Sequence, residues 1–546
     1  MTAIGKPMTT PAIDPAVHKR RWLILGVLVL SLLVVVLDSS ILNVALKTIA
    51  DPVKGLGASE TDLEWATNAY TLAFAGLLFT WGVLGDRIGR KKLLLIGMTV
   101  FGIGSLASAY SQTPGELIGA RVLMGIGGAA VMPTTLAIIS NVFEPKERAK
   151  AIGIWSGAVG IAIAIGPITG GVLLQHFWWG SVFLVNIPIV LIAVGLMVFL
   201  VPDSKNPRPG RFDPVGVPLS IAGITAFVYG IIRAGDIGWL KPEALGIIAA
   251  GVLLLVLFIL WERRTDHPAL NVKLFRHRGF SAAVAVVGAV FFALMGMTFF
   301  LSFYMQAVRG FSPLKCGVLL IPLAAAQLIF SSRSAGLVKR LGHKGVTATG
   351  MGLVTLALGY YSFVNAHTPI WCLEIALFAM GMGMANVMPP ATAAVMASVP
   401  REKAGEGSAI SNTVRQVGGA LGVAVLGSIL TSAYRSQITP VLNSVPQLHS
   451  SPGTVKDLSG SITATQAFVE KVGPRAEPLI RPANDAFVHA MHLAVFGSVA
   501  VGTLGVLIAL LWLPGRNALA HGTPAPAGVP APAAQARTEE RVPLVD

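Results

Sequence analysis

The sequence has little charge and almost no cysteine. Charged residues make up 12% of its 546 positions, about half of the share that is usual in soluble proteins. Both cysteines, Cys316 and Cys372, fall in apolar segments, so a disulfide framework is excluded. The phosphate-binding pattern GxxxxGK followed by Ser or Thr does not occur, and direct use of ATP is therefore not indicated. The scarcity of charge leaves no soluble domain of any size.

Apolar runs of about 20 residues recur along the whole chain. Hydrophobic residues account for 54% of the sequence, and its mean hydropathy is +0.71. Each run is long enough to cross a bilayer as a helix, so we predict an all-α polytopic membrane protein with fourteen transmembrane helices. The predicted spans are residues 22–46, 63–85, 93–110, 115–138, 151–173, 181–201, 215–234, 243–261, 280–304, 316–335, 346–364, 370–394, 407–430 and 486–513.

The positive charge is distributed unevenly between the segments that connect these spans. With both termini and every second connection on the cytoplasmic side, 27 of the 41 Lys and Arg residues face the cytoplasm and 10 face outward. This asymmetry is the positive-inside pattern. The net charge of +15 therefore reflects membrane topology, and no nucleic-acid partner is expected. The first apolar run lacks a small-residue cleavage site, so we expect a retained span rather than a signal peptide.

A short repeat divides the chain into two halves. Asp86 and Gly89, in the turn after the second span, align with Lys339 and Gly342 after the tenth span. Repeats of this kind are typical of transporters that rock one half against the other. We assign a cytoplasmic N-terminus to 1–21, six-helix bundles to 22–201 and 280–513, two inserted helices to 202–279, a long extracellular loop to 431–485, and a disordered, Pro/Ala-rich cytoplasmic tail to 514–546.

Asp38 lies deep in the first apolar run. A charge near the bilayer centre costs about 2.5–3.5 kcal/mol on insertion scales, so such a residue indicates a partner or a cavity. If the carboxylate is exposed alternately to two compartments, it can exchange a proton for a cation; the alternative is a fixed ion pair that holds two helices together. Glu374, one turn into the twelfth span, is a second candidate for a proton or cation site, or an interfacial side chain that reaches water.

Arg121 is the expected partner of Asp38, because a buried guanidinium needs an anion or carbonyl oxygens. A purely structural network of Arg121 with carbonyls is the alternative. Gly125 and Gly128 lie on the same helical face as Arg121 and permit close approach of another helix. Asn43 comes five residues after Asp38 and faces a different neighbour, which favours a packing role.

Two further patterns concern movement of the halves. Asp86 is the one acid in a basic turn, and its carboxylate could dock on a helix N-terminus, where it is favoured by about 0.3–1 kcal/mol. The fifth span carries a stripe of small residues that lets a neighbouring helix pack tightly and pivot; tight packing without motion is the alternative. The stripe comprises Gly153, Gly157, Gly160, Ala164, Pro167 and Gly171.

One face of the ninth span is rich in aromatic and methionine side chains. It provides an adaptable apolar wall for a hydrophobic substrate, while a lipid-facing surface would have the same composition. The pair His489 and His492 is a weak metal signal without a matching cluster, so we expect neither a metal nor a cofactor. No nucleophile, base and acid stand together as in an enzyme. The residues of the aromatic face are Phe292, Met295, Phe299 and Phe303.

These motifs resemble those of the major facilitator superfamily, and within it the fourteen-helix drug:proton antiporters that export quaternary-ammonium compounds and other drugs. The resemblance covers roughly residues 20–515 and is most specific in the segment 82–92. It implies that Asp38 is the coupling or substrate carboxylate and that Arg121 tunes it. The positions that it assigns to conformational gating are Gly82, Asp86, Arg87, Gly89, Arg90, Gly157, Gly166, Pro167, Gly170 and Gly171.

The sequence departs from the family pattern at several positions. Lys47 stands where proline is usual, Gly180 where arginine is common, and Met124 where a polar residue is frequent. Together with Asn43 and the aromatic face of the ninth span, Met124 is a candidate for the substrate pocket. The tenth span lacks the acid found in some exporters of dicationic drugs, so export of divalent cations would need Glu374 instead.

We therefore predict a monomeric, proton-coupled antiporter in the cytoplasmic membrane, with both termini in the cytoplasm and with protons and membrane lipids as partners. Its substrates would be hydrophobic, cationic small molecules such as drugs or toxic compounds. An exporter of lipid or of a cell-envelope precursor is one alternative. A non-transporting membrane sensor on the same fold is another, because fold does not determine function.

Overall fold

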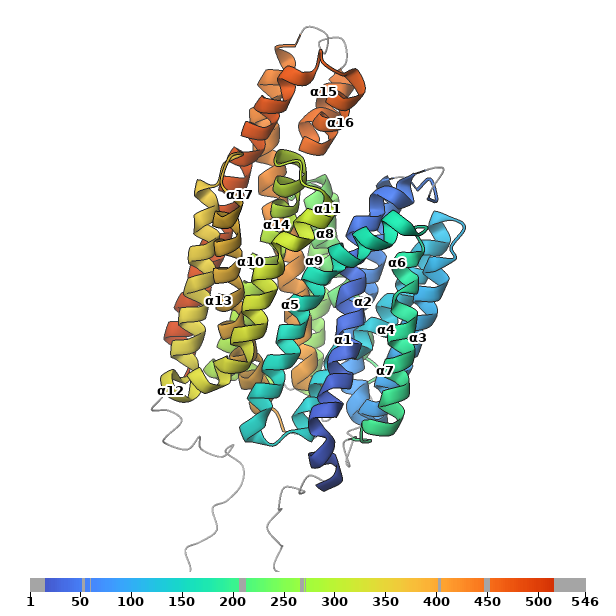
Figure 1. Cartoon of the computed structure of the whole chain (residues 1–546). Helices are drawn as coiled ribbons and strands as arrows, with labels where there is room; N and C mark the ends of the chain where they lie inside the picture. Colours follow the sequence, from blue (N-terminus) through green and yellow to red (C-terminus); the bar gives the residue numbers. More distant parts are fainter. Residues whose placement is uncertain are drawn as a thin grey trace, which may run out of the picture.

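The computed structural model consists almost entirely of α-helices (Figure 1). It describes residues 15–51, 55–58, 60–205, 213–265, 270, 272–400, 404–445 and 452–514. Within these ranges thirteen helical segments are long and apolar enough to span a bilayer. One segment, Leu314–Phe363, has 50 residues, which at about 1.5 Å per residue is enough for two crossings. The prediction of an all-α protein with fourteen membrane helices is confirmed.

The N-terminal half is a bundle in which six elements cross the apolar layer. Large apolar side chains such as Phe101 and Trp155 are fully buried between them. The sixth element consists of a four-residue helix followed by a longer one. The bounds are α1 Pro15–Ala50, α2 Glu60–Ile88, α3 Arg90–Ala109, α4 Pro114–Val142, α5 Pro145–His176, α6 Ser181–Leu184 and α7 Asn186–Leu200.

Two helices follow before the second half. α8 (Gly216–Ile237) packs on α9 (Pro242–Arg264), and α8 also contacts helices of both halves, α2 and α14. α9 exposes apolar side chains such as Leu253 and Leu257. The inserted pair therefore lies beside the contact between the halves, with α9 as its lipid-facing member.

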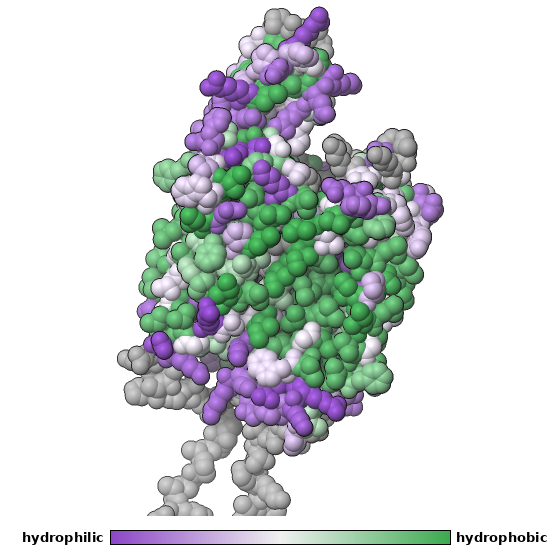
Figure 2. Space-filling model, viewed as in Figure 1, coloured by the Kyte–Doolittle hydropathy of each residue, from purple (hydrophilic) through white to green (hydrophobic). Residues whose placement is uncertain are grey.

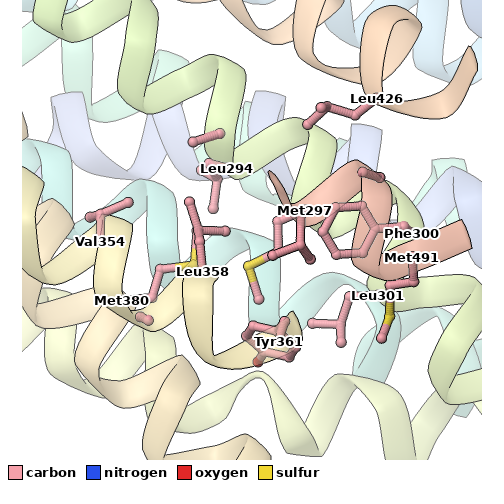
Figure 3. Close-up of a cluster of buried hydrophobic side chains, with 14 of the residues drawn as sticks. Leu294, Met297, Phe300, Leu301, Val354, Leu358, Tyr361, Met380, Leu426 and Met491 are labelled. Carbon is pink, nitrogen blue, oxygen red and sulfur yellow. The ribbon is translucent and has the colours of Figure 1, made fainter. Parts of the chain in front are cut away.

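The C-terminal half is the second bundle. Figure 3 shows its apolar interior, where Leu294, Met297 and Phe300 from one helix meet Leu358 and Met380 from two others. The bounds are η1 Val272–Arg276, α10 Arg278–Phe303, η2 Tyr304–Val308, α11 Pro313–Leu319, α12 Ile321–Tyr360, η3 Tyr361–Phe363, α13 Ile370–Ala397, α14 Ala404–Asn443, α15 Pro452–Gly460, α16 Ile462–Val472, η6 Glu477–Leu479 and α17 Ile480–Trp512.

The segment 431–485, expected to be a loop, is mostly helical. α14 and α17 continue past the bundle, and α15 and α16 lie between their ends, at the top of Figure 1. Tyr434 and Thr465 join α14 to α16 through their hydroxyl groups, 2.9 Å apart. Buried apolar residues, among them Ile438 and Ile462, pack inside this cap. The predicted Pro/Ala-rich tail lies outside the described residues.

The surface agrees with a protein that crosses a bilayer. Figure 2 shows, on the face in view, a broad hydrophobic band across the middle of the molecule and hydrophilic side chains gathered at both ends. Exposed Leu191, Phe199 and Leu356 are among the residues that face outward. Such a band is what lipid tails require of the helices that they touch.

The repeat predicted from the sequence has the same backbone feature in both copies. Gly89, between α2 and α3, has φ 111°, and Gly342, inside α12, has φ 75° and ψ 167°. L-residues with a side chain rarely adopt this conformation, so glycine is needed at both places. Gly342 divides α12 into two arms, which accounts for the tenth and eleventh predicted spans.

Substituting Gly342 should therefore strain the backbone at the turn in the second copy of the repeat. We expect Gly342→Ala to lower the free energy of unfolding by about 1–3 kcal/mol, the cost of a strained backbone. Gly352→Ala, in the same helix with open space around it, is the matched control and should leave stability unchanged or slightly raised. Thermal unfolding of both purified variants checks this; equal melting curves would contradict the role given to Gly342.

Candidate functional site: a buried ion pair and the contacts between the halves

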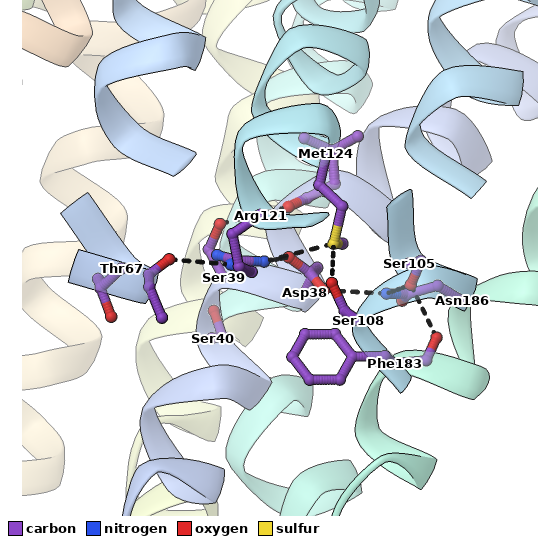
Figure 4. Close-up of polar contacts among 12 residues, drawn as sticks. Asp38, Ser39, Ser40, Thr67, Ser105, Ser108, Arg121, Met124, Phe183 and Asn186 are labelled. Atoms are coloured by element: carbon purple, nitrogen blue, oxygen red, sulfur yellow. Dashed lines mark hydrogen bonds and ion pairs between the residues drawn. The ribbon is translucent and has the colours of Figure 1, made fainter. Parts of the chain in front are cut away.

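Asp38 of α1 and Arg121 of α4 form an ion pair inside the N-terminal half. The guanidinium Nη1 lies 2.5 Å from the carboxylate Oδ2, and each side chain is only 1% exposed (Figure 4). Both charges lie inside their helices, Asp38 about three turns from the end of α1 and Arg121 about two turns from the start of α4. The structure thus places together the two residues that the sequence suggested as partners.

Asn186 completes the surroundings of the carboxylate. At the start of α7, its side-chain Nδ2 donates to Asp38 Oδ1 at 3.0 Å and also lies 3.0 Å from Ser105 Oγ. Ser105 in turn donates to the carbonyl of Phe183 at 2.9 Å. Both carboxylate oxygens are therefore held. Asn186 was not among the predicted site residues, although it lies in the segment 179–188, which also resembles the family pattern.

Arg121 has further partners besides Asp38. Its Nε donates to the carbonyl of Ala66 at 3.2 Å, and its guanidinium carbon lies 4.3 Å from the centre of the Tyr70 ring. The sulfur of Met124 is 3.7 Å from Nη1. The carbonyl contact and the ion pair, which the sequence left as alternatives, are both present. Arg121 would keep neutral contacts if the carboxylate lost its charge.

A second buried carboxylate, Asp86, joins the two halves. Its oxygens accept the backbone N–H of Gly405, near the start of α14, at 2.9 and 3.1 Å. Arg90 donates from Nη2 and Nε to Asp86 at 2.6 and 2.8 Å. The carboxylate thus docks on a helix N-terminus of the other half, as the sequence suggested. Arg87, its neighbour, is half-buried.

Close backbone contact supports this docking. A Cβ atom at Gly82 would lie 2.6 Å from the Cβ of Ala409 and 2.7 Å from the carbonyl oxygen of Gly405. Such distances are shorter than real Cβ atoms show, so α2 and α14 can touch only because glycine is present. Ser408 adds a hydrogen bond from its hydroxyl to the carbonyl of Pro133, at 2.6 Å.

α5 lies against both its own half and the other one. Part of its small-residue stripe faces the C-terminal half: Gly153 contacts Ser331 of α12, and Pro167 contacts Gly317 of α11. Gly157, Gly160 and Gly171 face the same two helices. Two glycines between stripe positions, Gly166 and Gly170, instead contact α1 at Ser40 and Ile41. The side chain of Ala164 lies outside the described residues.

A narrow cavity lies between the halves. α5 contributes Ser156 and Val159, α13 contributes Met384 and Met388, and the N-terminal arm of α12 contributes Leu323 and Gln327. The remaining lining residues are Phe291, Leu294 and Thr298 of α10, Leu320, and Arg415 of α14. Asp38 is not among them, so the ion pair and the cavity are separate in this conformation.

Several predicted pocket residues lie elsewhere. Met295 and Phe299 of α10 pack against glycines of α14, on a different face from Phe291, Leu294 and Thr298. Phe303 stacks edge-on against Phe299, and Phe292 is partly buried against the core. Met124 is buried beside the ion pair. The roles of these residues in substrate binding stay predictions, and the side chain of Asn43 lies outside the described residues.

Glu374 lies in the C-terminal half, away from the ion pair. It is half-buried in the first turns of α13, next to the exposed Trp371. The structure therefore does not bring the two carboxylate candidates into one site. His492 contacts the carbonyl of Val364 at 2.8 Å. Within the described residues there is no group of three or more His, Cys, Asp or Glu side chains that could hold a metal ion.

Comparison with known proteins identifies the family. Residues 28–423 match the model of the Major Facilitator Superfamily. The chain belongs to this superfamily. Its fold is similar to that of the human organic anion transporter MFSD10, with a TM-score of 0.58 over 91% of this chain and 100% of that one, at 13% identity. The superfamily consists of membrane transporters rather than enzymes.

Several similar curated proteins are resistance and efflux proteins. The methyl viologen resistance protein SmvA of Salmonella typhimurium is 35% identical over 88% of this chain and 96% of its own length. The multidrug efflux pump LfrA of Mycolicibacterium smegmatis is 35% identical over 80% and 84%. The tetracenomycin C resistance and export protein of Streptomyces glaucescens is 32% identical over 92% and 93%.

The ion pair yields a prediction about stability. Arg121→Met removes the partner of a buried carboxylate, which should cost about 3–5 kcal/mol of unfolding free energy. The double variant Asp38→Asn/Arg121→Met leaves no buried charge and should recover most of this loss. Thermal unfolding of the purified variants checks it; a double variant no more stable than Arg121→Met would contradict a coupled pair.

The docking of Asp86 yields a prediction about access. Asp86→Asn should weaken the contact between the two halves at α14. A cysteine introduced at the buried position Ser411 should then be labelled several-fold faster. Cys316 and Cys372 are replaced beforehand, so that only the introduced cysteine reacts. The reagent is a membrane-impermeant maleimide added on the side that carries Asp86.

The matched control is Glu144→Gln, which removes an exposed acid at the start of α5. It should label at the rate of the parent protein. If Asp86→Asn labels no faster than this control, the carboxylate does not hold the halves together.

Proposed function

We propose that this protein is a proton-coupled antiporter that exports hydrophobic, drug-like compounds across the cytoplasmic membrane. The observation that carries the proposal is the Asp38–Arg121 pair, a titratable group buried in the apolar layer with a cation beside it. Intramembrane pairs of this kind are characteristic of ion and proton pathways. The printed functions of the similar proteins, resistance and export, support the same class of activity.

The contacts suggest how protonation acts on the fold. A proton on Asp38 would neutralise it, and Arg121 would then depend on the Ala66 carbonyl and the Tyr70 ring. α1 would lose its strongest link to α4. Two and three residues after Asp38, Ser40 and Ile41 contact α5, which also packs on the other half. A change in α1 would therefore be transmitted directly to the contact between the halves.

The substrate class follows from the apolar cavity and from the relatives. Hydrophobic side chains line most of the cavity, which suits compounds that partition into membranes. The sequence predicts cationic compounds, and such a cation would have to compete with Arg121 for Asp38. In this scheme proton binding from outside releases the cation, and deprotonation inside resets the carboxylate.

Orientation and partners belong to the same proposal. The positive-inside pattern of the sequence supports an orientation with both termini in the cytoplasm. In that orientation the docking of Asp86 on α14 would close the cytoplasmic side. Protons and substrate would be the exchanged species, and lipids would surround a monomer. Gating would involve Asp86 with its glycine neighbours at one end and α5 between the halves.

Transport in vesicles tests proton coupling. An inward proton gradient imposed on vesicles that contain the purified protein should drive efflux of a hydrophobic dye, here rhodamine 123. Asp38→Asn should abolish the gradient-driven component, because asparagine preserves shape and hydrogen bonding but cannot titrate.

Asp62→Asn, which removes a carboxylate near the start of α2, is the matched control and should transport like the parent protein. Full-rate efflux by a folded Asp38→Asn variant would exclude the coupling role of Asp38. Absence of any dye flux from the parent protein would favour the sensor alternative instead.

A further inference from the structure

Arg415 is a buried cation without a buried anion. It lies in α14, lines the cavity between the halves, and is 6% exposed. Its Nη2 donates to Thr392 Oγ1 at 2.7 Å and its Nη1 to Asn412 Oδ1 at 3.4 Å, and both partners are neutral. Its Nε has no hydrogen-bond acceptor, and no described carboxylate lies within ion-pair distance.

This arrangement differs from that of the other fully buried arginines. Arg90 is paired with Asp86, and Arg121 with Asp38. An unpaired charge in a low-dielectric interior is costly, and buried charges are normally paired. An arginine left unpaired beside a cavity therefore indicates that the charge has a partner that is not part of the chain.

The neighbours of Arg415 fit an aromatic ligand with acceptor atoms. The guanidinium carbon is 5.1 Å from the ring centre of Trp155 in α5 and 5.6 Å from that of Phe291 in α10. The hydroxyl of Ser156, also buried and lining the cavity, has no hydrogen-bond partner. The cavity thus offers two free hydrogen-bond donors, one of them charged, between aromatic rings. No carboxylate is among the residues that line it.

We propose that Arg415 forms an acceptor subsite in the cavity, which binds a carboxylate, phenolate or carbonyl group of a hydrophobic aromatic substrate. A guanidinium binds such oxygens through directed, charge-assisted hydrogen bonds. This inference rests on the proposed function, because it assumes that substrate enters the cavity. The cavity is narrow in this conformation, so the subsite holds the polar group while the rest of the substrate occupies space that opens as the halves separate.

The competing explanation is structural. Arg415 and Trp155 come from different halves, so their contact alone could serve as a clamp between them. A clamp needs the cation but has no preference among ligands. The two explanations therefore differ in whether binding depends on the charge of the ligand.

Binding of two dyes with one ring system tests the subsite. Fluorescein is anionic, rhodamine 123 is cationic, and both share the xanthene ring. With the full-length protein in lipid nanodiscs and without a proton gradient, fluorescein should bind about tenfold or more tightly than rhodamine 123, the ratio expected for one charge-assisted hydrogen bond. Protein-free nanodiscs provide the background from lipid partitioning.

Substitutions at Arg415 test whether this residue causes the preference for the anionic dye. Arg415→Gln should weaken fluorescein binding about tenfold or more and leave rhodamine 123 binding equal or tighter, while Arg415→Lys retains part of the preference. Arg233→Gln removes the same charge from a partly exposed position in α8 and should change neither dye.

The outcomes separate the two explanations. Equal affinity of the parent protein for fluorescein and rhodamine 123 overturns the subsite, whatever the variants do. An anion preference that survives in Arg415→Gln overturns the assignment to this residue. If Arg415→Gln does not fold, the parent protein must bind fluorescein tightly and its neutral methyl ether methyl ester, in which both acidic groups are capped, about tenfold more weakly. Because no gradient is used, failure of proton coupling would not alter these results.

Discussion

The ion pair between Asp38 and Arg121 is the interaction on which the N-terminal half depends. A carboxylate inside an apolar layer is stable only if its charge is compensated and its lone pairs are used. Arg121 and Asn186 meet both requirements from two other helices. α1, α4 and α7 are thus held at one point by a contact that a single proton would change. No other ion pair described in this half is as deeply buried.

α5 connects this point with the rest of the molecule. Its glycines contact two sets of neighbours, α1 in the same half and α11 with α12 in the other. Helices in a membrane associate through close packing because lipid tails provide no hydrophobic drive between them. Small residues on both faces let α5 approach both neighbours. Because α5 contacts both α1, which carries Asp38, and the opposite half, it can couple the ion pair to the contact between the halves.

The buried charges have different functions to perform. Asp38 and Arg121 neutralise one another within one half, and Asp86 with Arg90 fastens that half to the N-terminus of α14. Among the described residues that line the cavity, Arg415 is the one charged side chain, and no anion lies beside it. An acceptor group of the substrate would then bind at a place separate from the titrating carboxylate, and helix contacts connect the two places. Such a separation lets the cavity accept varied compounds while the titrating group stays the same.

The sequence by itself determined the class of protein, the number and approximate positions of the membrane spans, and the repeat at Gly89 and Gly342. It also suggested Asp38 and Arg121 as partners but left a carbonyl network open as an alternative. These features depend on local composition and on the high cost of a buried charge, so they can be recognised without the fold. Only the tertiary structure revealed Asn186 as the second partner of Asp38 and the face of α10 that lines the cavity. A helix that is apolar on all sides carries no signal for which face turns inward. The helices that pack against it determine which face is buried, and these helices are distant in the sequence.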